Sequence, residues 1–262
     1  MRINFLNPFG TADYDAVIRE MLAPAVRSDV ELDVTHLDVV PALPNYYAEK
    51  HLVEVEVMRA AVRAQEDGYD ALVIGCCYDP GLVQARELVD IPVIGPLEAS
   101  VGMAHAFGHR YAVVTDMHKA VPEIADRIRL YGQEANCVGV TSVGWFIDAI
   151  VTDPVGLAND AYAEVTAVMD STGAETVILG CTIVSAFYEK AALDDPRLRA
   201  LSVMNPNLLA LKQAEALGDL HRLGQYRISR TSFYQRVDDH SSTDAAVLRQ
   251  ALFPDAAAPT PA

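Results

Sequence analysis

Two stretches of the sequence are copies of each other, and this internal repeat constrains the fold more than any other feature. Residues 67–77 read Asp-Gly-Tyr-Asp-Ala-Leu-Val-Ile-Gly-Cys-Cys, and residues 172–182 read Thr-Gly-Ala-Glu-Thr-Val-Ile-Leu-Gly-Cys-Thr. Each contains a short apolar run bounded by glycine, which is typical of a strand buried on both faces of a parallel sheet. Each run therefore brings a cysteine, Cys76 or Cys181, to the carboxyl end of a strand, where open α/β sheets place their ligands.

The repeat extends beyond the two cysteine strands. Apolar strand patterns alternate with amphipathic helix patterns, and the strand that ends in Asn7 corresponds to the strand that ends in Thr115. This alternation predicts an α/β fold with two doubly wound parallel-sheet halves related by a pseudo-twofold axis. The active site is expected in the cleft between the halves.

The same pattern predicts how the chain is divided. We expect residues 1–97 plus 205–225 to form the first α/β half, which contains Cys76, and residues 98–204 to form the second, which contains Cys181. Residues 240–262 are rich in Ser, Asp, Ala and Pro, so we expect a disordered tail there.

Charge and composition exclude several classes of protein. The formal net charge of −16 argues against a nucleic-acid partner, although a local pocket can still hold a small anion. No apolar run approaches the roughly 18 residues that span a bilayer, and the first residues are too short an apolar stretch for a signal peptide. We therefore expect a cytoplasmic protein without a membrane partner. Four cysteines without a Cys-x-x-Cys motif predict reduced thiols, neither a disulfide framework nor a metal site.

The two repeat cysteines suggest a chemistry. Each lies in a Gly-Cys turn before a predicted helix, where the helix dipole and free N–H groups favour a thiolate. The N–H groups of Cys77 and Thr182 are placed to hold a carboxylate or a developing enolate. If Cys76 and Cys181 face each other across a cleft, one can remove a proton from a carbon while the other returns one, with no cofactor. The alternative is that each is a small buried hydrophobic residue.

Each of the other candidate site residues can be explained either by a role in substrate binding or by a purely structural role. Asn7 and Thr115 occupy equivalent strand ends and could donate hydrogen bonds to a substrate, or they could cap the helices that follow. Tyr47 and Tyr78 could lie over the site or simply pack against it. Cys77 has reactive neighbours but no cysteine counterpart in the second copy.

At these residues the sequence resembles the Asp/Glu/hydantoin racemase superfamily, and most closely its hydantoin and allantoin racemase branch. Residues 76–82 read Cys-Cys-Tyr-Asp-Pro-Gly-Leu, similar to the Cys-x-x-Asp-Pro-Gly-Leu signature of that branch. Residues 179–182, Leu-Gly-Cys-Thr, resemble the second-cysteine motif of the superfamily, and Asn7-Pro8 resembles the N-terminal Asn-Pro turn. The resemblance covers about residues 2–225.

The resemblance implies roles for individual residues. It implies that Cys76 and Cys181 are the two acid/base groups. It implies that Asn7, Thr115 and the amides of Cys77 and Thr182 contact the substrate. It also implies the two-half α/β fold, the absence of a cofactor, and a homo-oligomer.

The sequence thus predicts a cofactor-independent racemase or epimerase that acts on a carbon next to a carbonyl. The substrate would be a 5-substituted hydantoin or a related small amide or amino acid. Gly-Cys-Thr at residues 180–182 leans towards amino-acid racemases, so the substrate stays open. The alternatives are a maleate-type cis–trans isomerase with one nucleophilic cysteine, an arylmalonate-type decarboxylase, and a non-catalytic thiol-redox or binding protein.

Overall fold

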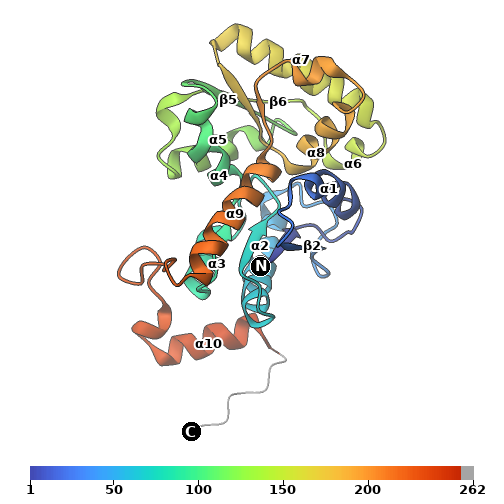
Figure 1. Ribbon diagram of the computed structural model, residues 1–262. Helices are drawn as coiled ribbons and strands as arrows, with labels where there is room; N and C mark the ends of the chain where they lie inside the picture. Colours follow the sequence, from blue (N-terminus) through green and yellow to red (C-terminus); the bar gives the residue numbers. More distant parts are fainter. Residues whose placement is uncertain (255–262) are drawn as a thin grey trace.

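The computed structural model describes residues 1–254, apart from the side chain of Ile147. It contains two four-stranded parallel sheets, which lie one above the other in Figure 1. The first sheet has the order β2-β1-β3-β4 and the second has the order β6-β5-β7-β8. The strands are β1 (Arg2–Asn7), β2 (Glu31–His36), β3 (Ala71–Ile74), β4 (Val93–Ile94), β5 (Tyr111–Thr115), β6 (Cys137–Ser142), β7 (Thr176–Leu179) and β8 (Val203–Met204). Because the two sheets share one topology, the two-half α/β fold predicted from the repeat is confirmed.

Helices cover both faces of each sheet. They are α1 (Asp15–Leu22), α2 (Tyr47–Glu66), α3 (Leu82–Leu88), α4 (Pro96–Met103), α5 (Ala120–Leu130), α6 (Ile147–Ile150), α7 (Pro154–Thr172), α8 (Thr182–Ala191), α9 (Pro206–Arg222) and α10 (Ser242–Leu252). Helices α2 and α3 pack on one face of the first sheet, whereas α1 and α9 pack on the other. Helices α7 and α8 cover one face of the second sheet, and α4 and α5 cover the opposite face. Within residues 1–254, no helix combines the length and the apolar character needed to cross a membrane.

The apolar runs that follow the repeat glycines form the central strands β3 and β7. In β3, Ala71 and Val73 belong to the core shared with α1 and α9, whereas Leu72 and Ile74 face α2 and α3. All four side chains are fully buried. A strand covered by helices on both faces has no polar face, which explains why its sequence is apolar without alternation.

A glycine follows each central strand because the adjacent strand leaves no space for a side chain there. A Cβ atom on Gly75 would lie 2.4 Å from the ring of Phe5 in β1. A Cβ atom on Gly180 would lie 2.5 Å from a methyl group of Val113 in β5. The repeated glycines therefore let adjacent strands approach closely just before each cysteine.

Two helices connect the halves by packing on different sheets. Helix α9 follows β8 of the second sheet but packs on β3 and β4 of the first, and in Figure 1 it runs down beside the lower half. Helix α4 follows β4 of the first sheet but contributes Leu97 and Val101 to the core beneath the second. The two helices also contact each other. The division into residues 1–97 plus 205–225 and residues 98–204 stays a prediction.

The C-terminal segment differs from the expected disordered tail. Residues 242–252 form α10, which the hydroxyl of Ser241 caps by accepting from the N–H of Asp244. The guanidinium of Arg59 in α2 donates to the carbonyls of Ala251 and Leu252, so the helix is anchored to the first half. The expectation of disorder is therefore wrong for α10, because local capping and contacts with α2 outweigh its polar composition. The end of the expected tail, 255–262, lies outside the described residues.

Asp79 has a different role from the one its sequence position suggests. The spacing of Asp79 and Pro80 is typical of a local helix N-cap, but α3 begins only at Leu82, after Gly81 with φ +67°. The buried carboxylate of Asp79 instead accepts from the N–H groups of Leu97 (3.2 Å) and Glu98 (3.0 Å), which caps α4. It also accepts from the hydroxyl of Tyr131 in the second half, at 2.7 Å. Burial raises the pKa of Asp79 to about 7, and these donors oppose that shift.

We expect Asp79→Ala to lower the free energy of unfolding by about 2 kcal/mol, since it leaves the buried donors at the start of α4 without an acceptor. The matched control is Asp153→Ala, which removes the exposed local cap of α7 and should cost about 1 kcal/mol. Urea denaturation at pH 8, where Asp79 is ionised, measures both. Equal losses in the two variants would contradict a structural role for Asp79 beyond that of a surface cap.

Candidate active site

The two repeat cysteines lie at equivalent places in the two halves. Cys76 follows Gly75 after β3, Cys181 follows Gly180 after β7, and their exposed fractions are 8% and 7%. Two contacts join these strand ends directly. The hydroxyl of Thr182 donates to the carbonyl of Gly75 at 2.8 Å, and the thiol of Cys77 lies 4.0 Å from the carbonyl oxygen of Leu179. These contacts place Cys77 and Thr182, which directly follow Cys76 and Cys181, at the junction of the two halves.

The surroundings of the two cysteines are not symmetric. Cys181 is the N-cap of α8, and the N–H groups of Ile183 and Val184 interact with its sulfur. Cys76 does not directly precede a helix, because an irregular segment of residues 77–81 separates it from α3. Its sulfur is contacted by the N–H of Tyr78. The expectation that both cysteines lie at a helix N-terminus is correct for Cys181 alone.

The expectation that these positions favour a thiolate is wrong for the structure as it stands. Burial raises the pKa of Cys76 to about 12, although the N–H of Tyr78 and the ammonium of Lys50 oppose the shift. Burial also raises the pKa of Cys181 well above its usual value, and the charge of Asp116 adds to the effect. The favourable N–H contacts are outweighed because both sulfurs are almost completely removed from water. Burial therefore favours the thiol form of both residues.

Asn7 lies at the end of β1 and is fully buried. Its Nδ2 donates to Asp15 at 2.7 Å, and the other carboxylate oxygen of Asp15 lies 2.8 Å from Nδ1 of His36. The Asn7 side chain therefore does not cap the following helix, which has Tyr14 as its N-cap residue. Among the described residues, the Oδ1 atom of Asn7 has no hydrogen-bond partner.

Thr115 occupies the corresponding position at the end of β5 and is also fully buried. Its hydroxyl lies 3.0 Å from both the carbonyl of Gly180 and Oδ1 of Asp116. The hydroxyl of Tyr78, from the first half, donates to the same Asp116 oxygen at 3.2 Å. Asp116 is not among the residues that the motifs identify, although its place directly after a repeat-related strand end is a signal for it.

Helix α2 reaches across the cleft at its N-terminal end. The ammonium of Lys50 lies 2.5 Å from a carboxylate oxygen of Glu123 in α5 and 3.4 Å from the ring centre of Tyr78. The hydroxyl of Tyr47 donates to the carbonyl of Lys119 at 3.3 Å. Tyr47 is about half exposed and lies at the rim, whereas Tyr78 is buried beside the cysteines. No sequence pattern singled out Lys50 or Glu123, because their pairing depends on how the halves meet.

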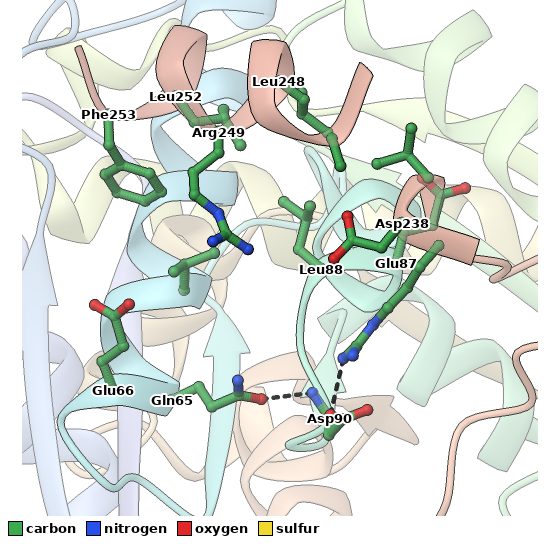
Figure 2. Close-up of a pocket in the computed structure, with 14 residues that line it drawn as sticks. Gln65, Glu66, Glu87, Leu88, Asp90, Asp238, Leu248, Arg249, Leu252 and Phe253 are labelled. Carbon is green, nitrogen blue, oxygen red and sulfur yellow. Dashed lines mark hydrogen bonds and ion pairs between the residues drawn. The ribbon is translucent and has the colours of Figure 1, made fainter. Parts of the chain in front are cut away.

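The cavity beside Cys76 is small. A cavity of about 20 Å³ is lined by Cys76 and Tyr78 together with Lys50 and Glu123, which is room for about one water molecule. A cavity of about 510 Å³ lies elsewhere, between α10 and the helices α2 and α3, and is drawn in Figure 2. None of the residues predicted for the site lines it. Within the described part of the chain, no group of three or more His, Cys, Asp or Glu residues is arranged to hold a metal ion.

Comparisons with known proteins agree with this geometry. Residues 3–214 match the family model described as Asp/Glu/Hydantoin racemase. A hydantoin racemase of Rhizobium meliloti is 30% identical over 218 residues, which cover 83% of this chain and 88% of that protein. A hydantoin racemase of Pseudomonas sp. (strain NS671) is 27% identical, with coverage of 84% and 87%. The crystal structure of an allantoin racemase from Pseudomonas fluorescens superposes with a TM-score of 0.79 at 25% identity, covering 90% of this chain and 97% of the other.

The family match covers both cysteine strands, and the structural match covers both halves of the fold. The resemblance seen in the sequence to the hydantoin and allantoin racemase branch is confirmed. The chain therefore belongs to the Asp/Glu/hydantoin racemase family, and it is an isomerase of the racemase type.

Proposed function

We propose that this racemase uses Cys76 and Cys181 as a pair of acid/base groups on opposite faces of one carbon, with a 5-substituted hydantoin or a closely related cyclic amide as substrate. The observation that carries the proposal is the placement of the two buried thiols at repeat-related strand ends, one in each half, that contact each other through Thr182 and Gly75 and through Cys77 and Leu179. The pKa of Cys181 is raised in part by Cys76, as expected of groups close enough to interact. The names of the sequence relatives support the substrate.

The reaction needs one cysteine as thiolate and the other as thiol. The thiolate removes the proton from the carbon next to a carbonyl, and the electron pair of the broken C–H bond moves onto the carbonyl oxygen to give an enolate. The opposite thiol then delivers its proton to the other face of the carbon, the enolate collapses, and the second cysteine is left as the thiolate. No electrons leave the substrate, so no oxidant, reductant or cofactor is required.

The contacts of the other site residues support roles in this reaction. The N–H groups of Cys77 and Thr182 follow the two cysteines in the chain and are candidates to hold the enolate oxygen. Thr115 positions Asp116, while Asn7 has a buried oxygen without a partner. Tyr78 lies between Asp116 and Lys50 and forms one wall of the cleft.

The closed cleft must open before a substrate can enter. A five-membered ring does not fit in about 20 Å³, so the contacts made by Lys50 and Tyr47 across the cleft have to separate. Closure after binding would exclude water and strengthen every electrostatic interaction with the enolate. The pairing of Lys50 with Glu123 is thus proposed as a contact that forms when the cleft is closed.

We expect Cys76→Ala and Cys181→Ala each to lower the rate of racemisation of 5-benzylhydantoin by at least about 100-fold, because each removes one proton-transfer group. Each variant should still exchange the α-hydrogen of one enantiomer with deuterium from solvent, since the remaining cysteine serves one face. Chiral chromatography measures the first rate, and proton NMR in deuterium oxide measures the second.

Cys137→Ala is the matched control, because Cys137 lies in β6, where its thiol contacts the carbonyl of Gly139. Its rates should stay within twofold of the original enzyme. Racemisation at the full rate by Cys76→Ala or by Cys181→Ala would contradict the two-thiol mechanism. Loss of activity only at Cys76 would favour a single nucleophilic cysteine instead.

Alkylation by iodoacetamide should be slow at Cys76 at neutral pH and rise about tenfold per pH unit through pH 9. The reagent reacts with the thiolate, and a pKa near 12 leaves that form scarce until the solution is strongly basic. Mass-spectrometric mapping of the modified peptides follows each cysteine separately. A rate that levels off near pH 7 at Cys76 would contradict a protonated resting state.

A further inference from the structure

One buried carboxylate near the cysteines, that of Asp116, has an oxygen atom without a hydrogen-bond partner among the described residues. Asp116 follows β5 directly and is fully buried. Its Oδ1 accepts from the N–H of Met117 at 2.8 Å and from the hydroxyls of Thr115 and Tyr78 at 3.0 and 3.2 Å. Its Oδ2 is also buried and has no hydrogen-bond partner among the described residues. A buried carboxylate oxygen without a donor is costly, so this atom indicates a missing N–H or O–H group.

The carboxylate lies beside Tyr78 and close to the two cysteines. Its charge raises the pKa of both Cys76 and Cys181, so it is within electrostatic reach of the two thiols. Its contact with Tyr78 joins the second half to the first across the cleft. Asn7 presents a second buried acceptor without a partner, Oδ1, at the matching end of β1. Because the Nδ2 of Asn7 is bonded to a carboxylate, its amide orientation is fixed and the free atom is an oxygen.

We propose that Asp116 determines the substrate specificity of this cleft: its Oδ2 accepts a hydrogen bond from an N–H group of a substrate that carries no net negative charge. This inference rests on the proposed function, since it concerns the same cleft and the same reaction. A 5-substituted hydantoin satisfies both conditions, because its ring is neutral and has two N–H groups. Aspartate and glutamate do not, because their net negative charge would be brought against a buried carboxylate.

The charge balance of the cleft agrees with this assignment. Lys50 is the cation that opposes Asp116, and its ammonium is already paired with Glu123. A substrate carboxylate would therefore have to compete with Glu123 for Lys50 in order to offset the charge of Asp116. A neutral amino acid is a second possible source of an N–H donor, through its ammonium group, and the experiment below separates it from a hydantoin.

The substitution Asp116→Asn tests the role of Oδ2 sharply. Three donors point at the position of Oδ1, so the amide oxygen of asparagine should take that position. The amide NH₂ group would then occupy the position of Oδ2. The variant thus keeps the shape and the internal hydrogen bonds of the site but presents a donor to the substrate in place of an acceptor.

For Asp116→Asn we expect the KM for 5-benzylhydantoin to rise about 10- to 100-fold, with a smaller change in kcat, because a charge-assisted hydrogen bond made on binding is lost. Of the 1-methyl and 3-methyl derivatives, one should bind the original enzyme at least 10-fold more weakly than 5-benzylhydantoin. That discrimination should disappear in the variant. Alkylation of Cys181 at a fixed pH should also become faster, because a negative charge near the thiol has been removed.

The matched control is Asp126→Asn, which removes one negative charge from the exposed face of α5, where Asp126 pairs with Arg129. Its kinetic constants should equal those of the original enzyme. A panel of 5-benzylhydantoin, phenylalanine and glutamate establishes the substrate class. Racemisation of 5-benzylhydantoin without glutamate supports the proposal, whereas faster racemisation of phenylalanine than of the hydantoin assigns the N–H group to an ammonium.

Three results would overturn the assignment. They are an unchanged KM in Asp116→Asn, glutamate turnover as fast as hydantoin turnover, and equal binding of both N-methyl derivatives and the parent compound by the original enzyme. The last of these needs no variant, so it decides the question even if Asp116→Asn and a second variant, Asp116→Ser, fail to fold.

Failure of the inference can be told apart from failure of the proposed function. If the original enzyme exchanges the α-hydrogen of a hydantoin but Asp116→Asn behaves identically, the two-cysteine reaction stands and the role of Asp116 falls. If the original enzyme exchanges no α-hydrogen in any compound of the panel, the proposed function falls and the inference falls with it.

Discussion

The close approach of the two central strand ends is the constraint on which the rest of this structure depends. The hydroxyl of Thr182 donates to the carbonyl of Gly75, and the thiol of Cys77 lies against the carbonyl of Leu179. Each half therefore contacts the end of the cysteine-bearing strand in the other half. These contacts hold the two cysteines at a single cleft. The glycines make the arrangement possible, since a side chain at Gly75 or Gly180 would collide with the neighbouring strand.

The same closeness explains why the thiols are protonated. Removing both sulfurs from water raises their pKa values more than the nearby N–H groups and Lys50 lower them. The proposed reaction therefore requires the pKa of one cysteine to fall, as it would if the site opened to water or its charges changed. The charge of Asp116 adds to the effect of burial, because it raises the pKa of both cysteines.

Much of the fold could be predicted because strands that are buried on both faces have a recognisable, continuously apolar sequence. The apolar runs of β3 and β7, the strand ends at Asn7 and Thr115, and the parallel order of the sheets all follow from hydrophobic patterning and the repeat. Local signals were less reliable where a residue had a distant partner. Asp79 resembles a cap for the next helix but caps α4, and α10 is anchored by Arg59 despite a polar composition that suggests disorder.

The sequence by itself determined the two-half α/β fold, the family, and the positions of Cys76 and Cys181 at equivalent strand ends, because all of these follow from a repeat that can be read along the chain. Only the tertiary structure decided what surrounds those cysteines. The burial that keeps them protonated, the reach of Lys50 to Glu123, and the unpartnered oxygen of Asp116 depend on how the two halves meet. Such contacts join residues that are far apart in the sequence. Hydrophobic periodicity and short motifs describe local structure, so they do not predict which side chains of the two halves meet.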